Sequence, residues 1–524
     1  EGEAGGFDIV IGNPPYVRKR LIAPPGLSPD KFGGEDSPQW EQQKQQYREK
    51  LQRLAVEPNS RNSGRALSGW ADLYVYFFFA SLRLLKPVGT LCFITSNSWL
   101  DVGYGRDLQA FLLQQGRLKM VIDNSAERSF SQAEVNTVIT LVGSKASQDK
   151  DDFVRFVLFK RPFTEIALCA AFKAAEDACA PATCADYRVL PVSRAELLGQ
   201  GLTRQDDDHA KPSFASGEER CHESGRWGKY LRAPNIFHLL ATHARMIPIR
   251  QVAVARLGVT TGANDFFFVK RLSPGLYLTT AFDEPQEIKL SDTCMLPVIR
   301  AVNECKRYSF RAEDATYYVL VAHRTCVDRL VRSYIHAAEA KGIHHRPFFR
   351  GRRCWYELGE LLRSRIVVPE LVYQRYFFAW NADNCALNKN FYGYQTAMDE
   401  QVLFGLLNFT FSFLYFELTG RKPGAGASGI NISIANQLPI VDPDSLSERH
   451  TKALIEATEN MRHRVILDLE EELQQPDRQA LDAALIDALG LPQSAKDDLY
   501  SELLALVRTR VGKARSTKQN SRND

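Results

Sequence analysis

Residues 7–17, FDIVIGNPPYV, end an apolar run with an amide, two prolines and an aromatic ring. Two consecutive prolines fix the backbone and carry no N–H donor, which leaves neighbouring carbonyl groups available to a ligand. Asn13 adds a side-chain carbonyl close by, so the segment can hold both hydrogens of a planar exocyclic amine. Holding these hydrogens turns the lone pair of the amine toward an electrophile. Tyr16 offers a flat ring for the heterocycle, and such stacking contributes about 1–3 kcal/mol for a nucleic-acid base.

A purely structural interpretation of this motif is a strand that ends at a Pro-Pro turn, with Tyr16 as a packed aromatic. We favour a functional interpretation because the motif follows an apolar strand, and open α/β sheets bind ligands at the carboxyl ends of their strands. The residues expected to carry the chemistry are Asn13, Pro14, Pro15 and Tyr16.

The elements around this motif alternate between strands and helices. We expect strands at Phe7–Ile11, Thr90–Thr95, Leu118–Asp123 and Thr137–Val142, and helices at Leu73–Leu85 and Arg106–Gln115. Such alternation predicts a mostly parallel sheet with helices on its faces. The polar residues 18–70 indicate a long insertion with one helix near Glu41–Leu54.

Three of these segments resemble the gamma-type adenine-N6 DNA methyltransferases. Residues 7–17 are similar to the catalytic motif of that family, and residues 71–100 to the helix and strand that follow it. Residues 129–143 are similar to the segment that supplies a second aromatic ring. Within the family, the chain most resembles the large adenine methyltransferases of type IIG restriction–modification enzymes and of BREX-type phage defence.

The resemblance implies a role for individual residues. Asn13 and Pro14 would bind the amino group of a flipped adenine, and Tyr16 and Phe130 would sandwich its ring. The implied cofactor is S-adenosylmethionine, with Asn13 and Phe77 beside it, although a place in the core suits Phe77 equally well.

The half of such an enzyme that binds most of the cofactor is not evident in the sequence. In the family, a glycine-containing loop and an acidic residue on earlier strands bind S-adenosylmethionine, and only six residues precede Phe7 here. The glycine-rich stretch Gly420–Gly429 has no expected strand before it and indicates a flexible loop. The first methionine is Met120. We therefore expect the chain to be part of a longer polypeptide, or to work with a separate subunit that carries the cofactor-binding half.

The second half of the chain predicts a domain that reads duplex DNA. Residues 254–269 and 406–440 resemble the opening and closing segments of the target-recognition domain of TaqI-like methyltransferases. Between them, residues 346–360 interleave arginines with aromatic rings, a pattern that can hold phosphates and wedge near a displaced base. The expected DNA contacts are Thr260, Thr261, Asn264, Arg350, Arg352, Arg353, Trp355, Tyr356, Arg421 and Lys422.

The residues expected to contact DNA also fit purely structural roles. The arginine cluster would equally fit a solvated basic loop with Trp355 packed beneath it. Thr260, Thr261 and Asn264 would serve simply to shape a turn, and Arg421 and Lys422 would lie on a glycine-rich surface loop.

The expected fold class is α/β: the C-terminal half of a Rossmann-like methyltransferase sheet, then an α+β target-recognition domain and a helical C-terminal segment. The expected boundaries are a partial methyltransferase domain at 1–155, a connecting region at 156–235, the target-recognition domain at 236–445, and a helical segment with a basic tail at 446–524.

The composition is that of an ordinary globular protein. Across 524 residues the net charge is +4, which permits nucleic-acid binding without arguing for it. Ten cysteines without CxxC pairs favour a reducing cytoplasm over a disulfide framework and match no zinc-binding pattern, so no metal is expected. We expect no membrane association, because no apolar run is long enough to cross a bilayer.

The leading hypothesis is methyl transfer from S-adenosylmethionine to a flipped adenine in duplex DNA, within a restriction–modification or phage-defence system. A DNA-recognition subunit without chemistry of its own, which lends its base pocket to a partner chain, is the alternative. A protein-glutamine methyltransferase would also use Asn-Pro-Pro-Tyr, but such enzymes are compact and need no long recognition half.

Overall fold

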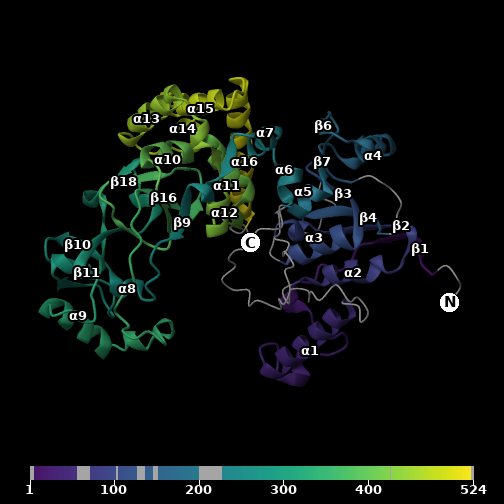
Figure 1. Cartoon of the computed structure of the whole chain (residues 1–524). Coiled ribbons are helices and arrows are strands. Elements are labelled where there is room, and N and C mark those ends of the chain that lie inside the picture. Colours follow the sequence, from purple (N-terminus) through teal and green to yellow (C-terminus); the bar gives the residue numbers. More distant parts are fainter. Residues whose placement is uncertain are drawn as a thin grey trace. The chain divides into compact units, whose positions relative to one another are not determined.

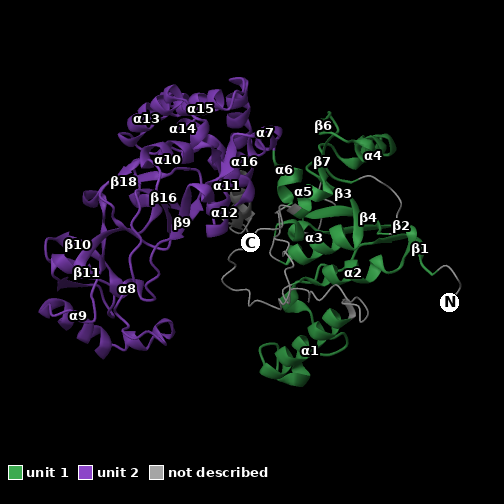
Figure 2. Cartoon of the chain, in the orientation of Figure 1, with its two compact units in different colours: residues 1–233 green, residues 234–524 purple. Residues whose placement is uncertain are grey.

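The computed structural model describes residues 5–55, 71–101, 104–126, 136–145, 152–199, 227–424 and 427–520. The chain divides into two compact units, unit 1 at Glu1–Ala233 and unit 2 at Pro234–Asp524 (Figure 2). Each unit combines helices with strands, so the protein has a mixed α/β fold (Figure 1).

Unit 1 is built around a seven-stranded sheet with the strand order β1-β2-β4-β3-β5-β7-β6. Its strands are β1 (Phe7–Gly12), β2 (Leu85–Ser96), β3 (Gly116–Asn124), β4 (Thr137–Ser144), β5 (Phe153–Phe159), β6 (Ala182–Thr183) and β7 (Tyr187–Ser193). Its helices are α1 (Pro38–Ala55), α2 (Leu73–Leu82), α3 (Gly105–Gln114), α4 (Leu168–Asp177), α5 (Arg194–Gly199) and α6 (Gly228–Arg232). Each strand and helix expected from the sequence is present, with ends that differ by a few residues.

The expectation of a mostly parallel sheet is wrong. Among the described strands of unit 1, the β1–β2 and β3–β5 pairs are parallel, and the other four neighbouring pairs are antiparallel. The chain leaves β3 and returns in β4 after about a dozen residues, the lower limit for a crossover that would make the strands parallel. Strand β4 therefore runs back between β2 and β3.

The two faces of this sheet are covered differently. On one face, α2 packs against β2, where Phe78 contacts Phe93 with ring centres 5.1 Å apart, and α3 packs against β3. On the other face, α4 covers β3, β5 and β7, and it buries Met120, Ile122 and Phe159. The expected connecting region at 156–235 supplies β7, α4 and most of β5, so it lies within unit 1 (Figure 1).

Unit 2 contains a six-stranded sheet, β12-β11-β10-β15-β13-β19, and a five-stranded sheet, β14-β18-β16-β20-β9. The strands are β8 (Met246–Pro248), β9 (Ala253–Leu257), β10 (Phe268–Ser273), β11 (Leu276–Thr279), β12 (Gln286–Lys289), β13 (Met295–Ile299), β14 (Ser309–Phe310), β15 (Tyr317–Leu320), β16 (Ile366–Pro369), β17 (Leu371–Val372), β18 (Ala379–Asn381), β19 (Ala386–Leu387), β20 (Phe391–Thr396), β21 (Arg421–Gly424), β22 (Ala427–Gly429) and β23 (Pro439–Val441). The helices are α7 (Asn235–Ala241), α8 (Asn264–Phe267), α9 (Arg329–Ala340), α10 (Glu400–Leu407), α11 (Thr410–Thr419), α12 (Ile432–Gln437), α13 (Glu448–Arg462), α14 (Leu469–Glu472), α15 (Pro476–Ala488) and α16 (Ser494–Asn520).

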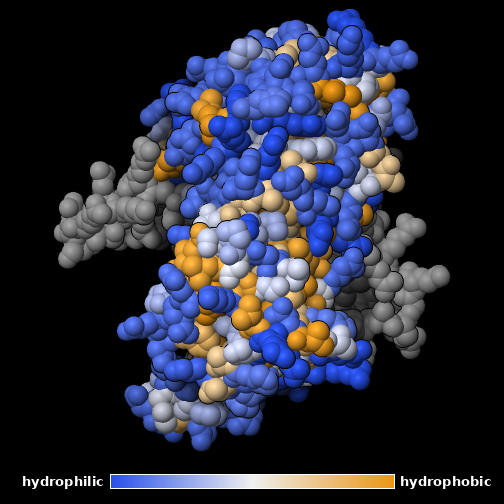
Figure 3. Space-filling model, turned by 90° about the vertical axis from the view of Figure 1, so that its left-hand side faces the viewer, coloured by the Kyte–Doolittle hydropathy of each residue, from blue (hydrophilic) through white to orange (hydrophobic). Residues whose placement is uncertain are grey.

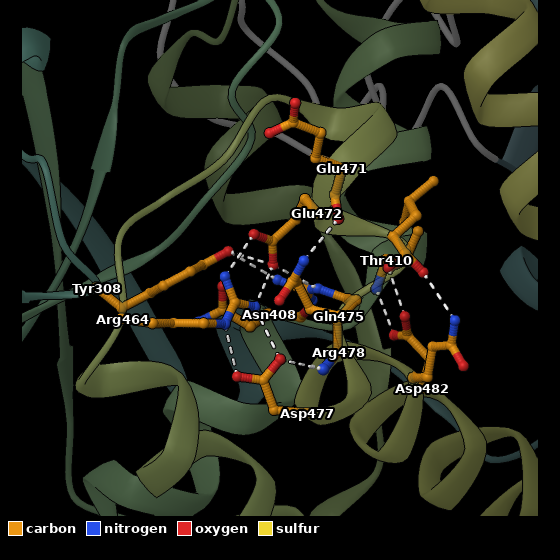
Figure 4. A network of polar contacts seen from close by, with 12 residues as sticks. Tyr308, Asn408, Thr410, Arg464, Glu471, Glu472, Gln475, Asp477, Arg478 and Asp482 are labelled. Carbon is orange, nitrogen blue, oxygen red and sulfur yellow. Dashed lines mark hydrogen bonds and ion pairs between the residues drawn. The ribbon is translucent and has the colours of Figure 1, made fainter.

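A buried network of charges joins the C-terminal helices to the sheets of unit 2 (Figure 4). Glu472 of α14 accepts hydrogen bonds from Tyr308, Arg464 and Arg478, at 2.8, 2.8 and 3.1 Å. Glu472 and Arg478 are both almost wholly buried. Nearby, Asp482 accepts from the hydroxyl of Thr410 at 2.6 Å. Because buried charges need partners, these contacts make the C-terminal helices an integral part of unit 2.

Of the helices that the structure describes, none alone has the length and apolar character to cross a membrane. The bent pair α10 and α11 meets those criteria when taken together, and its residues are almost all buried within unit 2.

Candidate active site and nucleic-acid interface

The Asn-Pro-Pro-Tyr segment follows the carboxyl end of β1, where Gly12 pairs in parallel with Phe93 of β2. Asn13 and Pro15 are exposed, whereas Pro14 between them is buried. The segment is thus anchored through one proline while the amide of Asn13 lies at the protein surface. This arrangement leaves the acceptor accessible to a ligand at the carboxyl end of the strand.

Tyr16 is half-buried, and its hydroxyl donates a hydrogen bond to the backbone carbonyl of Ile94 at 3.1 Å. Burial raises the pKa of this hydroxyl above its ordinary value, so it remains protonated and able to donate at neutral pH. The contact fixes the phenol ring beside the carboxyl end of β2. Tyr16 is therefore a positioned ring rather than one wholly packed into the core.

Contacts with the start of α2 hold the residues that follow the motif. The backbone N–H of Leu73 donates to the carbonyl of Val17 at 3.0 Å, and that of Lys19 donates to the Asp72 carboxylate at 3.0 Å. The hydroxyl of Tyr104 donates to the second oxygen of Asp72 at 2.7 Å. Asp72 thus positions the motif, a role that the sequence analysis missed. Its signal was an acidic residue directly before an apolar helix.

The two aromatic residues implied beside Tyr16 have different outcomes. Phe77 on α2 is 39% exposed, whereas Tyr76 and Phe78 on either side of it are buried. A core position for Phe77 is therefore wrong, and its ring is accessible at the surface. Phe130 lies outside the residues that the structure describes.

Strand β1, at the edge of the sheet, presents apolar side chains to solvent. The exposed fractions of Phe7, Ile9 and Ile11 are 59, 70 and 77%. Ile11 pairs with Cys92 of β2, and Cys92 with Leu141 of β4, so these three side chains lie on the same face of the sheet. Cys92 and Leu141 are only half-buried.

The same sheet face is well covered further along. Leu141 pairs with Met120 of β3, which is 2% exposed under α4. Among the residues that the structure describes, the apolar face therefore lacks a covering layer over β1 and is partly open over β2 and β4. We call β1 with this face the open edge of unit 1.

A tight turn precedes α8 at the expected DNA-contact site. Thr261 is fully buried, and its hydroxyl donates to the side-chain oxygen of Asn264 at 2.7 Å and accepts from the Ala263 N–H at 3.2 Å. Thr261 therefore shapes the turn, which agrees with the structural alternative, and its contact with DNA stays a prediction. Thr260 and Asn264 are exposed beside it.

The structure brings this turn against the arginine-rich loop 346–353, which we call the arginine loop. Arg346 forms a bidentate ion pair with Asp265, 81 residues away, through two contacts of 2.6 Å. Burial would raise the pKa of the Asp265 carboxyl, but the hydrogen bonds and charge of Arg346 outweigh burial and lower it below its ordinary value. Gly262 has a φ of +82°, and an added Cβ would lie 2.0 Å from Cδ1 of Phe348. A glycine is thus required where the turn meets the loop.

The side chains of the arginine loop and the segment after it point in different directions. Arg350 and Arg353 are exposed, and no acidic partner for them occurs among the described residues. Trp355 donates to Glu339 at 2.9 Å and packs on Phe266 with ring centres 4.8 Å apart.

Trp355 is therefore partly packed beneath the loop, and its contact with DNA stays a prediction. Tyr356 is half-buried against the same core. Arg352 lies over the ring of Phe348, with the guanidinium carbon 4.8 Å from the ring centre. Phe348 itself is 47% exposed, and the sequence analysis did not single it out.

The glycine-rich stretch after α11 forms strands β21 and β22, which pair antiparallel. The expectation of a flexible loop over Gly420–Gly429 is therefore wrong for its described part. Arg421 and Lys422 belong to β21, and their side chains lie outside what the structure describes.

Sequence comparison finds curated type II methyltransferases. M.BstVI of Geobacillus stearothermophilus is 27% identical over 303 residues, or 57% of this chain and 41% of the relative. M.AccI of Acinetobacter calcoaceticus is 20% identical over 307 residues, or 56% and 46% of the two chains. M.PaeR7I of Pseudomonas aeruginosa is 30% identical over 119 residues, or 23% and 16%. The chain thus spans less than half the length of these relatives.

Among solved structures, one similar to this chain is the type IIL restriction–modification enzyme MmeI in complex with DNA, and the match covers 95% of this chain and 57% of MmeI. The identity is 13% and the TM-score 0.46. The type IIG restriction endonuclease BpuSI matches 97% of this chain with 54% of its own, at 13% identity and a TM-score of 0.41.

Two family models match separate parts of the chain. The model of the Eco57I restriction–modification methylase matches residues 1–130, which contain β1, the Asn-Pro-Pro-Tyr segment and α2. The model of the C-terminal domain of the type II methyltransferase M.Eco57I matches residues 224–479, which contain both sheets of unit 2. Together the two models cover most of the sequence, and the chain belongs to the Eco57I family of restriction–modification methyltransferases.

Proposed function

We propose that this chain takes part in methyl transfer from S-adenosylmethionine to the exocyclic amine of an adenine flipped out of duplex DNA. The observation that carries the proposal is the geometry of the Asn-Pro-Pro-Tyr segment. Asn13 is exposed at the carboxyl end of β1, and the Tyr16 ring is fixed beside it by the hydrogen bond to Ile94. Family membership supports the reaction class.

Two kinds of contact would hold the base: hydrogen bonds to its amine and stacking on its ring. The carbonyl of Asn13 and the backbone carbonyls beside the prolines accept the two amine hydrogens, which directs the nitrogen lone pair away from the sheet. Tyr16 stacks on the ring, and the base reaches it only after leaving the duplex, at a cost of a few kcal/mol. Phe130 would cover the second face of the base.

S-adenosylmethionine, when bound, supplies the methyl group as a sulfonium electrophile. Asn13 and Phe77 would contact the cofactor, because both side chains are exposed on unit 1. Transfer would break the S–CH3 bond of the sulfonium and form an N–CH3 bond, which would leave neutral S-adenosylhomocysteine as the thioether product and release the amine proton to water. The remaining cofactor contacts must come from residues that cover the open edge of unit 1.

The open edge also supports a partner for unit 1. A parallel strand added beside β1 would pair its unused backbone groups, and a helix laid on the exposed face would bury Ile9 and Ile11. We propose that the cofactor-binding half docks here, either as an upstream part of the same polypeptide or as a separate subunit. If it is a separate subunit, this chain acts as the DNA-recognition subunit and has no activity without it.

In unit 2, we propose that the turn at Thr260 and Asn264 and the arginine loop contact duplex DNA, as a target-recognition domain. Arg350 and Arg353 are exposed cations beside this turn, suited to phosphate oxygens. Arg352, Tyr356, Arg421 and Lys422 remain proposed contacts. Restriction or phage-defence proteins would then act on the same DNA sites in a cytoplasmic setting.

The test is transfer of a labelled methyl group from S-adenosylmethionine to mixed-sequence duplex DNA, followed by digestion and separation of the nucleosides. The full chain is assayed alone and with the polypeptide encoded directly upstream. We expect N6-methyladenine only when that polypeptide is present. Asn13→Ala should abolish the product, whereas Asn235→Ala, an exposed asparagine on α7, should leave it unchanged.

Other products would redirect the proposal. N4-methylcytosine would keep the fold and exclude adenine as the target. Label on protein instead of DNA would favour a glutamine methyltransferase. Product formed by this chain alone would show that it builds its own cofactor site, and the proposed partner would be excluded.

A further inference from the structure

The arginine loop turns one of two adjacent rings outward. A single 3-10 turn, Pro347–Phe349, begins with a proline and carries both phenylalanines. Phe349 is 5% exposed and packs against Trp355, with ring centres 5.5 Å apart. Phe348 is 47% exposed, and its ring is nearly perpendicular to that of Phe349, at 85°. The buried ring anchors the turn and the exposed ring faces outward.

The exposed ring is held in place on several sides. Gly262 leaves no room between its backbone and Phe348, since any Cβ would collide with the ring. Arg352 lies over the same ring at 4.8 Å, and the Arg346–Asp265 ion pair ties the loop to α8. Phe348 therefore loses little conformational freedom when it meets a ligand. An apolar ring fixed at the surface in this way is prepared for binding.

Positive charge surrounds this ring. Arg350 and Arg353 are exposed near it, whereas the terminal nitrogen Nη1 of Arg352 is buried. Figure 3 shows hydrophobic patches within a mainly hydrophilic surface. An exposed aromatic ring beside exposed arginines suits duplex DNA, which carries phosphates on its outside and stacked bases inside.

We propose that Phe348 is a wedge that enters the base stack of duplex DNA while Arg350 and Arg353 contact the flanking phosphates. The inference rests on the proposed DNA binding of unit 2 and adds the residue that distorts the duplex. Apolar side chains that insert between base steps unstack them and kink the duplex. Unstacking costs free energy, and stacking on the inserted ring returns part of it.

A wedge should bind two DNA probes with different affinities. Two short duplexes of the same mixed sequence are used, one of which lacks a single base at an abasic nucleotide. The abasic duplex has a preformed gap, so the wedge enters without unstacking. The full chain should bind the abasic duplex about 10-fold more tightly than the intact one, within the range that stacking on one ring provides. Both affinities are measured at one salt concentration.

Variants of Phe348 test whether the preference belongs to its ring. Phe348→Ala should bind both duplexes equally, and Phe348→Tyr should keep the preference. Val465→Ala removes an apolar side chain of similar exposure, 48%, elsewhere in unit 2 and should also keep the preference. Retention of the full preference by Phe348→Ala would overturn the wedge while DNA binding stands. Failure of the wild-type chain to bind either duplex would overturn the DNA-binding role of unit 2 and the wedge with it.

Discussion

Unit 1 and unit 2 differ in how completely they bury what they contain. Unit 1 ends in an edge strand with three apolar residues more than half exposed, Phe7, Ile9 and Ile11. Unit 2 instead encloses fully buried charges and pairs them. The buried ion pairs tie the helices of unit 2 to its sheets, whereas the open edge of unit 1 is the surface at which we propose that another polypeptide docks.

Unit 2 depends on exact partners for its buried charges. Burial would raise the pKa of Glu472, but hydrogen bonds and charges from Arg464 and Arg478 lower it below its ordinary value. A second buried set joins α16 to α11, where Arg510 donates to Glu417 at 2.9 Å. These pairs connect helices near the C-terminus to elements far earlier in the chain, so they bind unit 2 into one cooperative structure.

We expect the most destabilising substitution to be Arg478→Met, which leaves buried acceptors in unit 2 unpaired. Removal of one partner from a buried ion pair costs about 3–5 kcal/mol of folding free energy. We expect hydrogen–deuterium exchange to rise throughout the core of unit 2 and to stay unchanged in unit 1. Arg449→Met replaces an exposed arginine of α13 and should leave both units as they are. Equal loss of protection in both units would contradict independent folding.

The open edge of unit 1 should tolerate a charge that the core of the same unit does not. Ile11→Asp should change the stability of the chain by less than about 0.5 kcal/mol, because the side chain is already in water. It should weaken binding of the cofactor-binding half by about 2 kcal/mol, the free energy of burying an isoleucine. Titration calorimetry with the upstream polypeptide measures this loss.

A matched control lies on the same sheet face. Ile122 is 1% exposed beneath α4, so Ile122→Asp should unfold unit 1. If Ile11→Asp proved as destabilising as Ile122→Asp, the edge would not be open in solution.

The two units also differ in how well their sequences predict them. In unit 1, the pattern of apolar residues along the sequence located β1 to β4. The Asn-Pro-Pro-Tyr motif identified the candidate site without any information on contacts between distant residues. The reversed direction of β4 was missed, because apolar runs do not encode strand direction. The contact between Asp72 and Lys19 was missed because it joins segments separated by a long insertion.

In unit 2, the arginine loop could be found from composition, but the orientation of its rings could not. Trp355 packs inward and Phe348 points outward, although both lie among arginines. The difference depends on Gly262 and Asp265, which are distant in sequence. The exposed side chains of a candidate site were therefore predicted only where a short motif defines them by itself.

A smaller effect is expected from Asp265→Asn, which loosens the arginine loop without touching the core. Both partners of the ion pair are about one-third exposed, so solvent screening limits its contribution to about 0.5–1 kcal/mol. The folded-state pKa of Asp265 is lowered, so this contribution is present above the unfolded-state pKa and is lost as the pH falls through the lower folded value. Urea unfolding at neutral and acidic pH should show a stability difference between wild type and variant that disappears in acid. A difference that grows in acid would contradict the ion pair.

The smallest expected effect concerns a single phosphate contact. Arg353 is exposed and has no acidic partner among the described residues, so Arg353→Ala should leave folding intact. Each phosphate neutralised by the protein contributes about 0.9 to the slope of log K against log salt. The variant should therefore bind duplex DNA with a slope shallower by about that amount, and equally for any sequence. Arg332→Ala on the exposed face of α9 serves as the control and should keep the wild-type slope. If Arg353→Ala kept that slope but lost sequence preference, Arg353 would read a base edge instead of a phosphate, and recognition by unit 2 would extend into its arginine loop.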